Sequence, residues 1–232
     1  MKRRVPALLA AVALTASLTA CGGDEKGDGG GADATKVLAE AKQQLDDTTG
    51  VHLALTTPEL PDGVSGVLSA EGDLTKAPAF QGALKVFFSG LTADVPVISV
   101  GGKVYAKIPP LQVKWNEVDP ADYQAPDPAA LIDPEGGVPG WLTAAEHVKK
   151  GKQEREGKSV VTVYTGSIPG EAVKSAIPTA VAQRSFDAEF RIDEHNRLVG
   201  GTFTGPFYGS GGDVVYDLAI SDYGLDKDIK AP

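Results

Sequence analysis

Residues able to perform metal or acid–base chemistry are few and scattered in this sequence. The three histidines are His52, His147 and His195, and none has a cysteine or a second histidine at the spacing of a zinc ligand set. We therefore interpret each one as an ordinary surface or boundary histidine. The acidic run SDYGLDKD at 221–228 lacks the spacing of an EF-hand loop, which favours a solvated C-terminal turn. No metal site and no cofactor are predicted.

The motifs of nucleophilic enzymes and of nucleic-acid binding are also missing from the sequence. GVSGV at 63–67 has the wrong spacing for a G-x-S-x-G elbow, and GSGG at 209–212 has no strand-to-helix context. No phosphate-binding glycine loop occurs. The formal net charge of -9 argues against nucleic acid, because phosphate binding needs a basic face. The sequence therefore predicts neither an enzyme nor a nucleic-acid-binding protein.

The one residue whose position indicates a definite chemistry is Cys21, the only cysteine of the chain. It follows a basic KRR at 2–4 and an apolar run at 5–20, which is the pattern of an export signal. A transmembrane helix is the alternative, but a span needs about 20 mostly apolar residues and this run is shorter. LTAC at 18–21 resembles the lipobox of bacterial lipoproteins, whose cysteine becomes the first mature residue and carries a diacylglyceryl thioether.

These features predict three segments. Residues 1–20 are a lipoprotein signal peptide, and residues 21–34 are a flexible tether that begins at the acylated cysteine, because glycine-rich charged stretches do not fold. Residues 35–232 form the folded domain. Two or more acyl chains on one residue give lasting membrane attachment, so we expect the domain outside the cytoplasm, on the outer face of the cell membrane.

Hydrophobic periodicity predicts one long helix followed by many strands. ATKVLAEAKQQL at 34–45 has apolar residues at helical spacing, and VHLALT at 51–56 alternates as a half-buried strand does. The Gly101-Gly102 pair suits a two-residue hairpin. Further alternating runs occur at 64–74, 80–89, 92–100, 103–108, 161–164, 186–193 and 213–221.

The few predicted helices do not suffice to cover so many strands. The proline-rich segment at 109–148 contains short helical pieces at 128–133 and 138–145, and another short helix is predicted at 169–176. About ten strands, each with one apolar face, form an antiparallel meander. An open sheet that curls on itself would bury that face only in part, although the alternation is equally compatible with a filled core.

Several features follow one another in a distinctive order along the chain. After the lipobox and the first helix come the hairpin ADVPVISVGGKVYAKI at 93–108, Trp115, PDPAALIDPEGGVP at 126–139, and EREGKSVVTVYTGSIPGEAVKSAIP at 154–178. In this order and spacing they resemble the LppX, LprA, LprF and LprG family of actinobacterial cell-envelope lipoproteins. The similarity runs from about residue 35 to the C-terminus.

The resemblance implies an α+β fold, a strongly bent antiparallel β half-barrel with helices on its concave side, enclosing a hydrophobic cavity for acyl chains. Cys21 corresponds to the acylated residue. Pro96 departs from the pattern, because proline within a strand implies an edge or a bulge. The positions that correspond to the cavity wall are Val95, Val97, Val104, Ala106, Leu131, Ile132 and Val138, and strand alternation alone adds Leu84, Val86, Phe186 and Phe190.

Two functional hypotheses follow. In the first, which the resemblance implies, a membrane-anchored lipoprotein binds the acyl chains of an envelope lipid or glycolipid and carries or presents them across the cell envelope. In the second, a non-enzymatic scaffold with a filled core docks an envelope partner. Both involve the membrane through the lipid anchor, and we expect a monomer that cooperates with an envelope transporter or another partner protein.

Overall fold

A computed structural model of the protein describes residues 29–110, 112–123, 125–157, 159–209 and 211–232. The predicted signal peptide, the acylation site Cys21 and the first part of the predicted tether lie outside these described residues. In the described part of the chain, no helix is both long enough and apolar enough to cross a membrane.

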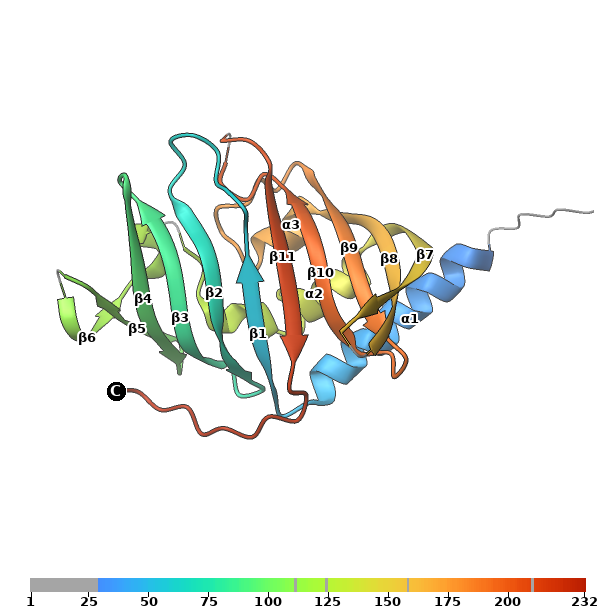
Figure 1. Ribbon diagram of the computed structural model, residues 1–232, viewed down its shortest axis with the longest axis horizontal. Helices are drawn as coiled ribbons and strands as arrows, with labels where there is room; N and C mark the ends of the chain where they lie inside the picture. The colour runs from blue at the N-terminus through green and yellow to red at the C-terminus, as the bar shows by residue number, and fades with distance from the viewer. Residues whose placement is uncertain (1–28, 111, 124, 158, 210) are drawn as a thin grey trace, which may run out of the picture.

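In the part of the chain that the structure describes, eleven strands form one antiparallel sheet (Figure 1). Its order is β6-β5-β4-β3-β2-β1-β11-β10-β9-β8-β7, so that β6 and β7 are the two edges and the sheet is curled but not closed. The pairing of β1 with β11, with Leu53 opposite Ile220, joins the two halves. The strands are β1 Gly50–Thr56, β2 Gly66–Thr75, β3 Ala79–Phe88, β4 Leu91–Val100, β5 Lys103–Ile108, β6 Gln112–Val118, β7 Glu146–Glu156, β8 Ser159–Pro169, β9 Ser185–Asp193, β10 Leu198–Gly205 and β11 Val214–Ser221.

One long helix and several short ones accompany the sheet. Helix α1 buries Leu38, Ala41 and Leu45 on one face, as its helical spacing predicts. It begins at Gly29, before the predicted boundary at residue 35, and Ala34 is already buried. The helices are α1 Gly29–Asp47, α2 Val138–Ala144 and α3 Gly170–Lys174, with the 3-10 helices η1 Pro120–Tyr123 and η2 Pro128–Ile132.

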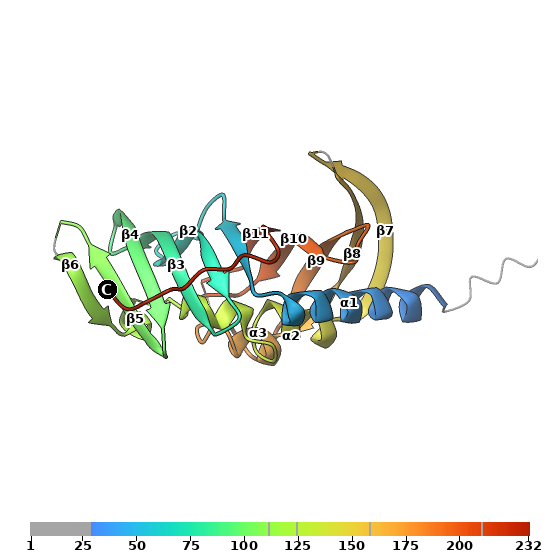
Figure 2. The same ribbon diagram turned by 90° about the horizontal axis from the view of Figure 1, so that it is seen from below.

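The helices cover the two halves of the sheet unequally. Figure 2 shows α1, α2 and α3 along one face of the sheet. Helix α1 packs against β7 and β10, and α3 packs against β8 and β9. In the other half, η2 lies against β2, β3 and β4. The β3–β6 half is therefore covered by short 3-10 turns and the proline-rich connection rather than by longer helices.

Strand alternation assigns each side chain of β4 to one of the two faces of the sheet. Val95 and Val97 join the main core on the helix side, together with Leu84 of β3. Ile98 points to the opposite face, where it packs with Ala79 and with Ile229 of the C-terminal segment. After β11 this segment runs back past the lower ends of β1 to β4 in the view of Figure 1.

The structure confirms most of the predicted elements and adds three strands: the edge strands β6 and β7, and the inner strand β10, which no predicted run covers. Gly101 and Gly102 both have positive φ, 62° and 73°, as a two-residue hairpin between β4 and β5 requires. The edge strands β6 and β7 were not predicted, since their side chains are almost all exposed and carry no apolar alternation. Pro96 causes no bulge; it lies one residue beyond the last β4–β5 pair, Val97 with Ala106.

Candidate ligand pocket

A pocket of about 590 Å³ lies beneath the β3–β6 half of the sheet. Its walls come from alternate residues of β3, β4 and β5, from β6, and from the segment between β6 and η2. The lining consists of Leu84, Val86, Phe88, Leu91, Thr92, Ala93, Val95, Val97, Val104, Ala106, Ile108, Pro109, Pro110, Gln112, Val118, Pro120, Tyr123, Ala125, Pro126 and Pro128.

The lining is uncharged and almost entirely apolar. Thr92, Gln112 and Tyr123 are its only side chains with polar atoms among the described residues. An unpaired anion or cation would pay a large desolvation cost in such surroundings, whereas hydrocarbon would not. The volume lies within the 300–1,000 Å³ range that is typical of small-molecule sites.

The empty space has a local cause in the sequence. Five prolines, Pro109, Pro110, Pro120, Pro126 and Pro128, contribute to the wall. Proline lacks the backbone N–H needed inside a helix, so the segment between β6 and α2, which contains Pro120, Pro126 and Pro128, forms only short 3-10 helices. Short turns bring fewer apolar side chains to the sheet than a long helix does, and the inward faces of β3–β6 remain incompletely covered.

Two small voids continue the pocket toward the middle of the sheet. A void of about 50 Å³ shares Leu84, Pro126 and Pro128 with the pocket. A further void of about 10 Å³ shares Leu131 and Val138 with the first. Shared walls place the three spaces in a row, with the largest beneath the β3–β6 half of the sheet.

Two tyrosines close the 50 Å³ void with a polar but neutral contact. The hydroxyls of Tyr208 and Tyr216 lie 2.7 Å apart, Val67 N donates to Tyr208 at 2.9 Å, and Tyr216 donates to the Val67 carbonyl at 2.5 Å. Burial raises the pKa of both phenols above the ordinary value of 10.0. They therefore stay uncharged at neutral pH, and their hydrogen bonds secure the start of β2.

The structure brings together part of the set of residues predicted for the cavity wall. Leu131 and Val138 line both small voids, and Ile132 lines the smaller one. Phe186 and Phe190 line none of these spaces, because helices cover their half of the sheet; their rings pack edge-on against Phe207 at 4.8 Å and Phe203 at 5.7 Å. The predicted residues on the wall of the large pocket are Leu84, Val86, Val95, Val97, Val104 and Ala106.

Several lining residues were not predicted. Phe88 continues the alternation of Leu84 and Val86 by one more step, so the strand pattern contained the signal. Leu91 likewise continues the alternation of Ala93 and Val95 to the first residue of β4, whereas Tyr123 had no such signal, because a 3-10 helix places it. Within the described residues, no group of three or more His, Cys, Asp or Glu side chains is placed to hold a metal ion.

The comparisons with known proteins agree with this architecture. LprF of Mycobacterium bovis superposes with a TM-score of 0.69 at 15% identity, over 87% of this chain and 97% of LprF. The lipoprotein LppX of Mycobacterium tuberculosis superposes with a TM-score of 0.64 at 20% identity, over 86% of this chain and 99% of LppX. These likenesses define the class of fold, the curled and open antiparallel sheet found in mycobacterial lipoproteins.

The sequence comparisons place the chain within that class. A family model described as LppX_LprAFG lipoprotein matches residues 33–228. The lipoarabinomannan carrier protein LprG of Mycolicibacterium hassiacum is 29% identical over 189 residues, which is 79% of either chain. The protein belongs to the LppX_LprAFG lipoprotein family, which confirms the resemblance found in its sequence.

Proposed function

We propose that this lipoprotein binds the acyl chains of an envelope lipid or glycolipid in the β3–β6 pocket and carries or presents them across the cell envelope. The observation that carries the proposal is a pocket of about 590 Å³ without a charged side chain in its lining. Burial of each methylene contributes about 0.8 kcal/mol, so long chains bind better than short ones.

In this proposal the curled sheet is the wall of a half-barrel, with the helices on its concave side, and the ligand completes the apolar interior. The polar head of the lipid stays in water, because an unpaired polar group pays a desolvation cost in an uncharged pocket. The name of the relative LprG, a lipoarabinomannan carrier, supports an acylated glycan as the class of ligand.

Acylation at Cys21 anchors the protein in this proposal, on the outer face of the cell membrane. Membership in a lipoprotein family and the lipobox at 18–21 support this location. The folded domain then works within reach of the bilayer that supplies or accepts the lipid.

The proposal is tested on the full chain, expressed with its own leader in an actinobacterial host. We expect organic extraction of the purified protein, followed by mass spectrometry, to release an acylated lipid beyond the anchor itself. Fluorescent fatty acids of increasing length should bind with rising affinity. If the protein carries no lipid and takes up no probe of any length, the scaffold hypothesis with a filled core replaces the carrier.

A further inference from the structure

The turn between β3 and β4 is apolar where surface turns are usually polar. We call residues 86–93, VFFSGLTA, the β3–β4 tip. None of them is ionisable, and the first charges on either side, Lys85 and Asp94, form an ion pair at 2.6 Å across the two strands. The tip is therefore an uncharged hairpin end closed by a neutral pair.

The backbone of the tip is tightly defined and presents its large side chains outward. Ser89 and Gly90 have φ values of 51° and 82°, as a two-residue turn with both central residues left-handed requires. Phe88 and Leu91 flank this turn as a cross-strand pair and remain 40% and 75% exposed. The Phe88 ring also meets Tyr123 of η1 edge-on, with 6.0 Å between the centroids.

The exposed side chains of the tip are continuous with the pocket. Phe88, Leu91 and Tyr123 reach the surface, and all three also belong to the pocket lining. A hydrocarbon chain that left the pocket here would pass along apolar side chains instead of entering water. Exposed apolar patches of this kind mark protein or membrane contacts, and the absence of charge favours contact with lipid.

The chain outside the described residues limits where the tip can meet a bilayer. Cys21 precedes Gly29 by eight positions, a contour length of about 28 Å. Figure 1 places the start of α1 and the β3–β6 half at opposite ends of the long axis. The tip therefore reaches the anchoring membrane when the long axis lies along the membrane surface.

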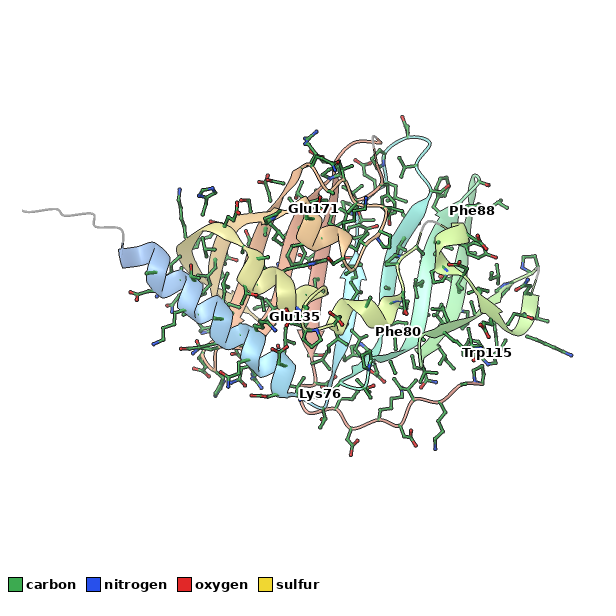
Figure 3. All side chains as sticks on the ribbon, turned by 180° about the vertical axis from the view of Figure 1, so that it is seen from behind. Lys76, Phe80, Phe88, Trp115, Glu135 and Glu171 are labelled. Carbon is green, nitrogen blue, oxygen red and sulfur yellow. The ribbon has the colours of Figure 1, made fainter. Side chains whose placement is uncertain are left out.

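We infer that the β3–β4 tip inserts into the interfacial layer of the lipid bilayer and opens the pocket toward the acyl chains. This inference rests on the proposed function, because it assigns the membrane as the source or acceptor of the pocket's ligand. Phe88 and Leu91 enter the interface, while the Lys85–Asp94 pair remains among the headgroups. Figure 3 shows Phe88 at the outer margin of the molecule, far from Lys76 in the turn at the other end of β3.

The experiment uses the full lipidated chain, reconstituted through its anchor into vesicles of phosphatidylglycerol and phosphatidylethanolamine. A cysteine introduced by Thr92→Cys carries an environment-sensitive fluorophore, and Lys76→Cys is the matched control in the opposite turn. Vesicle lipids that bear a spin-label quencher report insertion. We expect strong quenching at position 92 and little at position 76.

The matched substitutions decide whether the apolar tip causes the insertion. Leu91→Ser should lower the ratio of inserted to free tip by about tenfold, because burial of the apolar carbons of one leucine contributes about 1.4 kcal/mol or more to the free energy of insertion. Val160→Ser removes an apolar side chain that is 41% exposed near the hairpin of β7 and β8, far from the tip, and should change nothing. Equal quenching at positions 76 and 92, or insensitivity to Leu91→Ser, overturns the inference. Uptake of a fatty-acid probe without vesicles tests the pocket separately, so the two proposals fail independently.

Discussion

Filling the pocket from within its wall separates an open pocket from a packed core. Val97 is 4% exposed and lines the pocket, whereas its neighbour Ile98 is 6% exposed and lies in a small cluster on the opposite face of β4. Val97→Trp and Ile98→Trp therefore place the same large ring one residue apart, on the two faces of one strand.

The expected magnitudes differ for a structural reason. A pocket of about 590 Å³ accepts the indole of Val97→Trp, so the free energy of unfolding should fall by less than about 1 kcal/mol. If the ring displaces about four methylenes of a bound chain, acyl affinity falls by about 3 kcal/mol, or about a hundredfold. Ile98→Trp has no such space and should cost about 1–3 kcal/mol of stability.

Two measurements on each variant check this reasoning. Urea unfolding at pH 7 gives the stability, and titration with a fluorescent long-chain fatty acid gives the affinity. We expect Val97→Trp to bind the fatty acid more weakly but to keep its stability. We expect Ile98→Trp to lose stability, while its folded fraction binds the fatty acid with unchanged affinity. If Val97→Trp destabilises as much as Ile98→Trp and probe binding is unchanged, the pocket is not the ligand site.

Three further perturbations follow from particular contacts. Burial raises the pKa of Asp193, but the hydrogen bonds from Arg197 lower it by more, so the pKa lies below 3.8. Asp193→Asn should therefore lower the free energy of unfolding by about 1.5–3 kcal/mol, measured in urea at pH 7. This difference shrinks as the pH falls through the lowered pKa. Phe186→Ala empties a fully buried site beside Phe207 and should cost about 3–5 kcal/mol by the same assay, without the affinity loss of a pocket variant. Cys21→Ser removes the proposed anchor, and fractionation should show no diacylglyceryl-modified protein in the membrane; membrane protein that still incorporates labelled fatty acid would contradict the anchor.

Local pattern was enough for the strands whose two faces differ. Val95 and Val97 alternate with outward residues, and the pattern placed them correctly on the inner face of β4. The local pattern was not enough for β7, whose charged residues are almost all exposed. An edge strand that is solvent-exposed on both faces has no hydrophobic periodicity. The pairing of Lys150 with Tyr164, rather than any pattern within residues 146–156, makes this segment a strand.

The sequence predicted which strand residues could form the wall of a pocket, but not which half of the sheet the pocket occupies. Leu84 and Phe190 have the same alternating signal on comparable strands, yet only Leu84 borders the pocket. The difference lies in what covers them: Phe190 packs against Phe203, which also contacts Trp141 of α2, while Leu84 faces the turn segment that contains Pro126 and Pro128. No short stretch of the sequence shows which of the two strand faces a distant segment will cover.

The amino-acid sequence by itself determined the family, the alternating faces of the strands and the uncharged character of the wall, since these depend on residue type and on the two-residue period of the backbone. Only the tertiary structure decided that the space lies beneath β3–β6 and that the β3–β4 tip borders it. Empty volume is left where distant segments fail to fill a face, and here α1, α2 and α3 pack toward the β7–β10 strands while proline-rich turns cover the other end.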